Sequence, residues 1–244
     1  MDVKSASRTL DLFELFARER QPLTLSELAT ALDAPLSSCF NLVKSLTNRG
    51  FLFGAGPHKQ IYPTRKMYDI ASAIAAADPW LQRILPRLEA LRDATGETAI
   101  LGKEQGGRVV YLVVLEGAQN IRYTARPGDL KPLHSSAIGK ALLAAMTAPA
   151  REKAMSKLKL EAMTDATIVD RARLAEEIDA TIARKYSITR GENVADVMAI
   201  AAPVKFRDDT YGIAVAGPMH RMNEHVAEHQ RRLAATCREI EENR

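Results

Sequence analysis

The stretch LTLSELATALDAPLSSCFNLVKSLTNRG, residues 23–50, predicts two short helices joined by a tight turn. Thr24 and Glu27 have the spacing of a capping box, in which the two side chains bind the free amides at a helix start. Asp33-Ala34-Pro35 predicts the turn, because proline fits a first helical position, where an N–H would lack a partner. Gly50 is a typical helix stop. The pattern therefore indicates a helix-turn-helix.

The second of these helices has two unlike faces. Cys39, Leu42, Val43 and Leu46 recur at helical spacing and predict its buried side, so Cys39 is assigned to the core. The opposite side carries small polar, amide and cationic groups, namely Ser37, Ser38, Asn41, Lys44, Ser45 and Asn48. Groups of this kind meet base edges and phosphates in a DNA major groove. We therefore expect a recognition helix.

The segment that follows predicts a wing. Residues 51–53 and 60–62 are strand-like, and the turn between them ends in a basic tip, His58 and Lys59, that can touch the DNA backbone. No Asp or Glu occurs from residue 34 to residue 68, a window that contains Lys44, Arg49, Lys59, Arg65 and Lys66. Such a window predicts a surface for phosphates, although a basic surface without a partner is the alternative on charge alone.

Two further helices complete a first domain, expected at residues 1–77. An amphipathic helix is predicted near the start, because apolar residues recur there at three- and four-residue intervals, at Val3, Ala6, Leu10, Phe13 and Ala17. An apolar-rich helix at 67–77 closes the domain, and Asp78-Pro79 marks the boundary. Residues 78–244 are expected to form the second domain.

The second domain is expected to be α+β, with helices on the faces of a mixed sheet. Helix patterns lie at 80–95, 136–146, 151–157, 171–186 and from about 223 to the end. Strand patterns lie at 98–104, 109–116, 120–125, 198–206 and 211–217, with Gly106-Gly107 as the first hairpin turn.

Composition narrows the class of protein. The 244 residues carry a formal charge of +4, with 46% apolar and 26% charged residues, which is ordinary for a soluble globular protein. No stretch approaches the ~20 apolar residues of a membrane span, and the first residues lack the apolar core of a signal peptide. Two cysteines, Cys39 and Cys237, exclude a disulfide scaffold, so we expect a reducing, cytoplasmic location.

Three strings resemble catalytic motifs but are incomplete. His225-Val226-Ala227-Glu228-His229 matches H-x-x-E-H, yet a zinc site needs a third ligand, and a solvated helix is the favoured interpretation. Gly139-Lys140 lacks the earlier glycine and the following Ser or Thr of a phosphate-binding loop. His134-Ser135 has no acid partner placed by the sequence. We therefore predict no catalytic residue, no metal and no cofactor.

Several motifs, in order, resemble those of the isocitrate-lyase-regulator (IclR) family. They are SRTLDLF (7–13), LTLSELA (23–29), LVKSL (42–46) and RGFL (49–52), followed by PLHSSAIGKALLA (132–144), TDATI (164–168), IAAPV (200–204) and GP (217–218). The resemblance implies a winged helix-turn-helix followed by a GAF-like effector domain that binds a small metabolite, often an organic acid. It also implies homodimers, often paired into homotetramers, on double-stranded operator DNA.

The expected DNA contacts follow from the helix-turn-helix and the wing. The residues concerned are Arg8, Ser26, Ser37, Ser38, Asn41, Lys44, Ser45, His58 and Lys59. Two positions depart from the family pattern: Leu36 stands where members often carry a basic residue, and Asn41 stands where they often carry Arg. The base preferences of typical members are therefore not carried over, because Asn pairs with adenine whereas Arg prefers guanine.

The resemblance also implies where an effector binds. Family members hold a small acid with an Asp before the penultimate strand, a Cys on that strand and two Ser on the last strand. The corresponding positions here are Thr189, Ala199, Ala214 and Ala216, and Ala137 and Ile138 lie at a helix start whose N–H groups can meet a carboxylate. These residues predict a roomier pocket for an aromatic or longer apolar acid, and poor binding of glyoxylate or pyruvate. The alternative is that the alanines only allow close strand packing.

The prediction is a metabolite-responsive transcriptional regulator that is not an enzyme. Two alternatives stay open: a small-molecule hydrolase or other enzyme fused to a DNA-binding module, and a DNA-binding architectural protein without a ligand. A gel shift beside a metal-supplemented hydrolase screen tests the first. A thermal-shift panel of metabolites tests the second, because only a sensor is stabilised by a specific metabolite.

Overall fold

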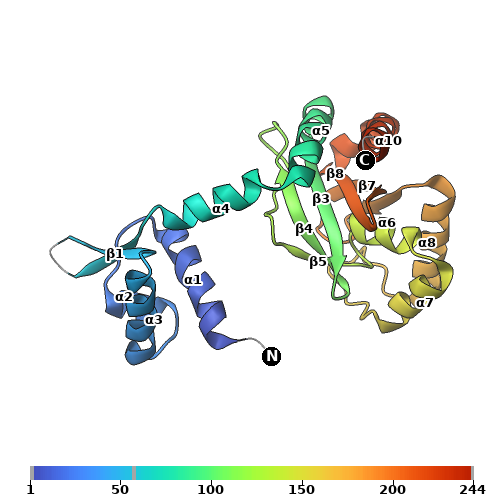
Figure 1. Ribbon diagram of the computed structural model, residues 1–244. Coiled ribbons are helices and arrows are strands. Elements are labelled where there is room, and N and C mark those ends of the chain that lie inside the picture. The colour runs from blue at the N-terminus through green and yellow to red at the C-terminus, as the bar shows by residue number, and fades with distance from the viewer. Residues whose placement is uncertain (1–2, 57–58, 243–244) are drawn as a thin grey trace. The chain divides into compact units, whose positions relative to one another are not determined.

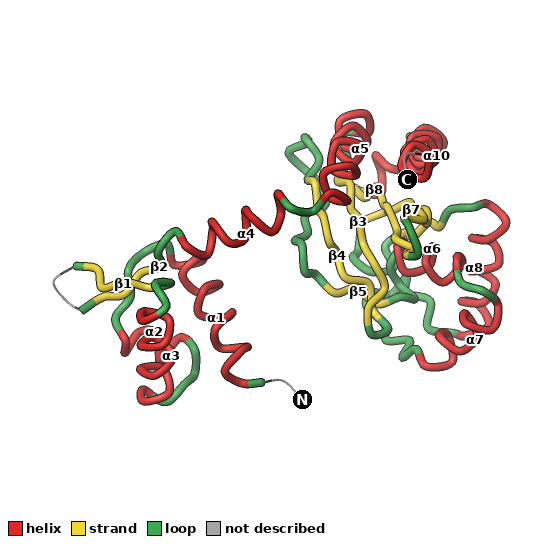
Figure 2. The backbone as a smooth tube through the Cα atoms, viewed as in Figure 1, coloured by secondary structure: helices red, strands yellow, loops and turns green. Residues whose placement is uncertain are grey.

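Figure 1 shows the computed structural model, which describes residues 3–56 and 59–242. The chain folds into two compact units, Met1–Pro79 and Trp80–Arg244. The first unit is helical with a small hairpin, and the second is built on one larger sheet (Figure 2). The expected fold class, a winged helix-turn-helix followed by an α+β domain, is confirmed.

The first unit follows the predicted order of elements. Its helices are α1 (Lys4–Glu19), α2 (Leu25–Ala31), α3 (Leu36–Asn48) and α4 (Lys66–Ala76), and its wing consists of β1 (Leu52–Ala55) and β2 (Gln60–Pro63). The capping box of α2 forms: the backbone N–H of Thr24 donates to Glu27 Oε2 at 2.7 Å, and the N–H of Glu27 donates to Thr24 Oγ1 at 3.3 Å. Pro35 directly precedes α3 instead of lying within it.

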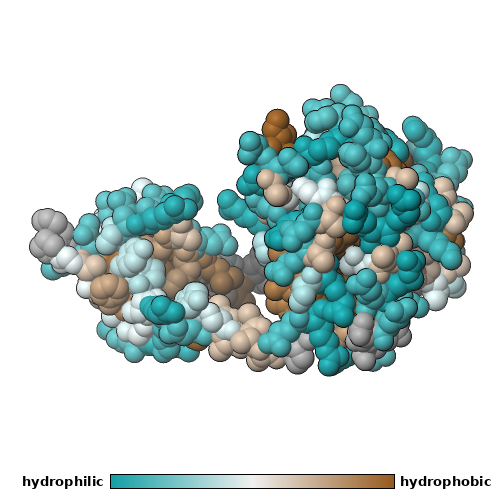
Figure 3. Space-filling model, turned by 90° about the horizontal axis from the view of Figure 1, so that it is seen from above, coloured by the Kyte–Doolittle hydropathy of each residue, from teal (hydrophilic) through white to brown (hydrophobic). Residues whose placement is uncertain are grey.

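The buried face of α1 differs from the predicted one. Leu12, Leu15 and Phe16 are buried, whereas Val3 and Leu10 of the predicted face are 66% and 63% exposed. α1 therefore carries two apolar stripes. The stripe with two leucines and a phenylalanine packs into the core, because it buries the larger apolar area. The other stripe is left at the surface of the unit. Figure 3 shows that part of the surface of the first unit is hydrophobic.

The second unit is a six-stranded sheet in its described part, with every pairing antiparallel. The strand order is β5-β4-β3-β8-β7-β6. The strands are β3 (Thr98–Gln105), β4 (Arg108–Leu115), β5 (Leu130–Pro132), β6 (Ser187–Arg190), β7 (Val197–Phe206) and β8 (Asp209–Pro218). The helices are α5 (Pro79–Thr95), α6 (Ala137–Ala145), α7 (Ala148–Lys157), α8 (Arg171–Arg184), α9 (Met219–Glu224) and α10 (Val226–Glu242).

Alternating strand residues divide the core of this unit in two. On β7, Met198 and Ile200 pack with α5, α9 and α10, whereas Ala201 packs with α6 and α8. On β8, Val215 belongs to the first core, and its neighbours Ala214 and Ala216 belong to the second. Successive side chains of a strand point to opposite faces. The start of α6 therefore meets a wall of alanines on the central strands.

Four details of the second unit differ from the predicted elements. Residues 120–125 form a loop and not a strand, and the Thr98 hydroxyl donates to the Tyr123 carbonyl at 2.5 Å. The edge strands β5 and β6 are absent from the prediction, because three or four residues give too little periodicity. α7 begins at Ala148, three residues early, and the terminal helix is interrupted at His225.

Candidate functional site

The exposed face of α3 carries the polar residues that the sequence assigned to it. The side chains of Ser37, Ser38, Asn41, Lys44 and Ser45 are all exposed, and we call this set the α3 polar face. The start of α1 lies beside it, because Lys4, Ser5 and Arg8 line one surface depression together with Ser38, Asn41 and Ser45. Arg8 is half-buried there, and Lys4 is a neighbour that the sequence did not assign. The α3 polar face is thus flanked by two cations from α1.

The remaining predicted DNA contacts lie on two other elements. Ser26 is exposed in the first turn of α2. Lys59 is exposed just before β2, and its φ of 52° turns the backbone into the left-handed region at the tip of the wing. His58 lies outside the described residues.

Other cations of the acid-free window have structural roles. Lys66 Nζ donates to the carbonyl oxygen of Arg49 at 2.7 Å and lies 4.9 Å from the ring centroid of Phe51. The contact joins the start of α4 to the end of α3. Arg65 pairs with Asp69 at 3.2 Å and lies over the ring of Tyr68. These cations are therefore engaged within the unit, whereas Lys44 is exposed on α3.

A pocket lies between the start of α6 and the sheet of the second unit. It contains about 390 Å³ of space free of protein atoms, and its walls include every residue that the sequence proposed for an effector: Ala137, Ile138, Thr189, Ala199, Ala214 and Ala216. We call it the α6 pocket. Strand pairing brings three of these residues together, because Ala199 lies opposite Thr189 on one side and Ala216 on the other.

Further residues of the α6 pocket were missed by the sequence analysis. They are Ile100, Tyr111, Tyr123, Ser136, Asn193, Val194 and Val197. Alternation along β4 from Val109 is the signal that places Tyr111 on this face. Tyr123 and Asn193 lie in loops, where no periodic pattern points to them.

The start of α6 presents backbone amides to the pocket. Ser136 caps the helix: its Oγ accepts from the N–H of Gly139 at 3.2 Å and donates to the carbonyl of Pro132 at 2.7 Å. The N–H groups of Ala137 and Ile138 belong to the first turn, where no helical carbonyl is available to them. A side chain at Gly139 would place its Cβ 2.3 Å from the Leu133 carbonyl oxygen, so glycine is needed for this close approach.

Two tyrosines add polar atoms to the pocket, beside those of Ser136, Thr189 and Asn193. Both Tyr111 and Tyr123 are buried. Burial raises the pKa of Tyr111 well above its usual value, and the neighbouring Tyr123, to which the Tyr111 hydroxyl donates a hydrogen bond, raises that pKa further. Tyr111 is therefore neutral at physiological pH and keeps its proton as a hydrogen-bond donor.

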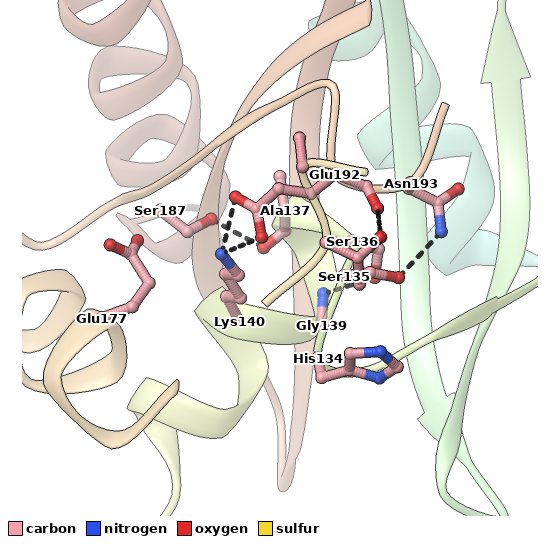
Figure 4. Close-up of polar contacts among 12 residues, drawn as sticks. His134, Ser135, Ser136, Ala137, Gly139, Lys140, Glu177, Ser187, Glu192 and Asn193 are labelled. Atoms are coloured by element: carbon pink, nitrogen blue, oxygen red, sulfur yellow. Dashed lines mark hydrogen bonds and ion pairs between the residues drawn. The ribbon is translucent and has the colours of Figure 1, made fainter. Parts of the chain in front are cut away.

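The 191–196 loop lines one side of the α6 pocket, and side-chain contacts to α6, to the residues before it and to Thr167 hold the loop in place. Figure 4 shows Lys140 of α6 directed at the Glu192 carboxylate, and the two are joined at 2.6 and 2.8 Å. The amide of Asn193 donates to Ser135 Oγ at 3.0 Å. The hydroxyl of Thr167 donates to the Glu192 carbonyl at 2.7 Å. Burial raises the pKa of the Glu192 carboxyl, and the Lys140 ammonium opposes that rise.

The catalytic-looking strings have structural explanations. His134 Nε2 donates to the Glu161 carbonyl at 3.0 Å, and Lys140 is the partner of Glu192. His229 is buried, whereas Glu228 is half-buried and pairs with Arg232. Among residues 3–56 and 59–242, no three His, Cys, Asp or Glu side chains gather closely enough to hold a metal ion. Nor does any helix in the described ranges combine the length and apolarity needed to cross a membrane.

Comparison with known proteins identifies both units. A family model described as the IclR helix-turn-helix domain matches residues 5–52, and one described as bacterial transcriptional regulator IclR C-terminal matches residues 75–242. The chain belongs to the IclR family. It is 32% identical over 224 residues to the HTH-type transcriptional regulator BhcR of Paracoccus denitrificans. The matched region covers 91% of this chain and 80% of BhcR.

Solved structures of IclR proteins share the fold along nearly the whole chain. The crystal structure of the Thermotoga maritima IclR has a TM-score of 0.83 at 22% identity and covers 98% of this chain and 97% of that one. An IclR homologue from Microbacterium hydrocarbonoxydans, solved in complex with 4-hydroxybenzoate, has a TM-score of 0.76 at 21% identity. The match covers 98% of this chain and 100% of the homologue.

Membership of the IclR family decides the class of function. The chain is a transcriptional regulator with a helix-turn-helix and an IclR effector domain, and it is not an enzyme. The alternative of an enzyme fused to a DNA-binding module is therefore set aside.

Proposed function

We propose that this IclR-family regulator binds operator DNA with residues 1–77 and senses an aromatic or longer apolar acid with residues 78–244. The observation that carries the proposal is the α6 pocket, which is lined by the start of α6 and by the alanines of β7 and β8. Such a pocket offers one polar end and one apolar body, which matches the two ends of an apolar carboxylic acid.

The DNA interface combines base contacts and phosphate contacts. The α3 polar face enters the major groove, where Asn41 is suited to pair with adenine. Arg8, Ser26, His58 and Lys59 contact phosphates beside the groove and set the position of α3. Two observations support this surface: the exposure of the α3 polar face, Ser26 and Lys59, and the absence of carboxylates from residues 34–68 of the sequence.

The effector is oriented by the two ends of the α6 pocket. Its carboxylate lies at the N–H groups of Ala137 and Ile138, where the positive end of the helix dipole favours an anion. Its apolar body packs against Ala199, Ala214 and Ala216. Because the Tyr111 hydroxyl donates its proton to Tyr123, its oxygen can accept a hydrogen bond from a hydroxyl substituent on that body. The solved IclR homologue that contains 4-hydroxybenzoate supports an acid of this class.

Small polar acids fit these walls poorly. Each buried polar group of a ligand that lacks a partner costs about 1–3 kcal/mol, and alanines supply no partner. Because about 1.4 kcal/mol corresponds to a factor of ten in affinity, pyruvate and glyoxylate should bind at least tenfold more weakly than benzoate or 4-hydroxybenzoate.

Isothermal titration calorimetry of the full chain with these four acids tests the proposal. Tight binding of either small acid, with benzoate and 4-hydroxybenzoate inert, would refute the apolar pocket. Heats absent for all four acids would instead favour the reading in which the alanines only allow close strand packing.

The first unit also carries a surface suited to a second copy of this chain. Val3 just before α1, Leu10 on α1, and Tyr68, Ile70 and Ile74 on α4 are all 40% or more exposed. Single exposed apolar residues are ordinary, but several on one small domain are typical of an interaction site. We assign this surface to a homodimer that places two copies of α3 on a pseudo-palindromic operator. Two such dimers would pair into a tetramer through the second unit.

A further inference from the structure

The recognition helix α3 exposes two large apolar side chains. Leu36 is 53% exposed and Phe40 is 51% exposed, although Cys39, Val43 and Leu46 of the same helix are buried. Residues four apart on a helix are surface neighbours, so Leu36 and Phe40 lie one above the other. Lys44 continues the same row by one more turn. The row therefore forms one edge of the α3 polar face.

The chemistry of a DNA major groove offers one apolar group to such a row. Each base pair presents donors and acceptors there, and thymine adds its 5-methyl group. Lys44, at the end of the row, and the lack of any Asp or Glu in residues 34–68 favour an anionic partner. The helix-turn-helix in which α3 lies makes DNA that partner. Asn41 follows Phe40 directly in the chain and is suited to adenine, the partner of thymine.

We propose that Leu36 and Phe40 are specificity-determining residues that contact thymine methyl groups in the operator, next to the adenine bound by Asn41. This inference rests on the DNA interface proposed above. It gives each half-site at least one A·T pair whose thymine is recognised by its methyl group. The methyl group lies in the major groove alone, which makes the contact separable from phosphate and minor-groove contacts.

Uracil substitution tests the proposal directly, because uracil is thymine without the methyl group. An operator is first selected from randomised duplexes with the full chain, and each thymine of one half-site is then replaced by uracil, one at a time. Binding should weaken about fourfold at one or two positions, the equivalent of burying one methyl group. Equal affinity for every uracil-containing duplex would overturn the proposal.

A second measurement assigns the contact to a residue. Phe40→Ala should bind the thymine duplex more weakly and lose its preference for thymine over uracil at one position, and Leu36→Ala should do the same at a neighbouring position. Comparing each variant on both duplexes cancels any effect of uracil on the DNA itself. Phe40→Leu should retain part of the preference, because the leucine side chain still reaches the groove.

The matched control is Phe53→Ala. Phe53 is 46% exposed on β1 of the wing, outside the recognition helix, so its loss should leave the ratio of thymine to uracil affinities unchanged. A Phe40→Ala variant that keeps the wild-type ratio shows that Phe40 does not contact a methyl group. Failure of the wild-type chain to select any duplex would contradict the DNA interface itself, which is a different result.

Discussion

The ammonium nitrogen of Lys140 lies 2.8 and 2.6 Å from the two carboxylate oxygens of Glu192, and both residues are buried. The pair joins α6 to the 191–196 loop, so both walls of the α6 pocket depend on it. Removing one partner of a buried pair costs about 3–5 kcal/mol, because the other charge is left uncompensated. We expect Lys140→Met to destabilise the second unit by this amount.

The fluorescence of Trp80, the single tryptophan of the chain, can be used to measure this loss of stability. It packs against Phe206 and Tyr211 in the second unit, so its fluorescence during urea denaturation follows the unfolding of that unit. The double variant Lys140→Met/Glu192→Leu should lose much less stability, because no charge is left unpaired. Equal losses in the single and double variants would show that the unpaired charge is not the cause.

His229 makes the second unit sensitive to acid. It is buried, and neither ring nitrogen has a hydrogen-bond partner among the described residues. Burial lowers its pKa in the folded chain; Glu97 and Glu228 oppose that shift, and His225 and Arg232 add to it. The unfolded chain therefore binds a proton first, and stability falls by up to about 1.4 kcal/mol per pH unit as the pH drops below about 6.5.

The measurement is Trp80-monitored urea denaturation between pH 7.5 and 5. His229→Leu should flatten the pH dependence and should not destabilise the unit at pH 6, since it removes two unpaired nitrogens. The exposed His220, replaced by Leu, serves as the control. An unchanged slope in His229→Leu would assign the acid sensitivity to another group.

Lys44 and Lys66 should differ in their effect on DNA binding. Lys44→Ala should weaken binding to all sequences and reduce the slope of log affinity against log salt by about 0.9, the value of one phosphate contact. Lys66 already donates to the Arg49 carbonyl, so Lys66→Ala should lower the stability of the first unit and leave the salt slope unchanged. Fluorescence anisotropy at several salt concentrations gives the salt slope of each variant. Equal changes of slope in the two variants would contradict the assignment of Lys44 to DNA binding and of Lys66 to stability.

The α6 pocket should be blocked by a larger side chain on β7. Ala199 is partly exposed and lines the pocket, so Ala199→Leu fills the space without crowding a buried core. We expect at least tenfold weaker binding of the preferred acid and a melting temperature of the ligand-free chain within a few degrees of wild type. Ala234→Leu on α10 is the matched control, since Ala234 lies outside that pocket. Normal binding by Ala199→Leu would place the effector elsewhere.

Self-association should depend on the exposed stripe of the first unit. Leu10→Lys and Ile74→Lys each place a charge among the exposed apolar residues of α1 and α4 that we assign to the homodimer. Each variant should lower the molar mass measured by sedimentation or by light scattering at micromolar concentration. Ile121→Lys is the control, because Ile121 is equally exposed, at 72%, but belongs to the second unit. A mass unaffected by Leu10→Lys and Ile74→Lys would assign the dimer contact to another surface.

The features that the sequence predicted correctly are local ones. The capping box at Thr24 and Glu27 and the buried face of α3 depend on residues within two turns of one another. The α1 face was wrong, because two apolar stripes share the helix and only tertiary packing selects Leu12 and Phe16. Tyr123 and Asn193 enter the α6 pocket from loops whose path is set by Thr98 and Ser135, partners far away in the chain.

The alternation along β8 has a consequence for how this regulator can change over evolution. Ala214 and Ala216 face the α6 pocket, and Ile213 and Val215 between them face the other core. Pocket residues can therefore be exchanged one at a time without disturbing the packing of α5 and α10. A one-residue insertion in β8 would exchange the two faces and damage both. Point substitution at alternate positions is thus the route by which relatives sharing this sheet can diverge in the small molecules that they bind.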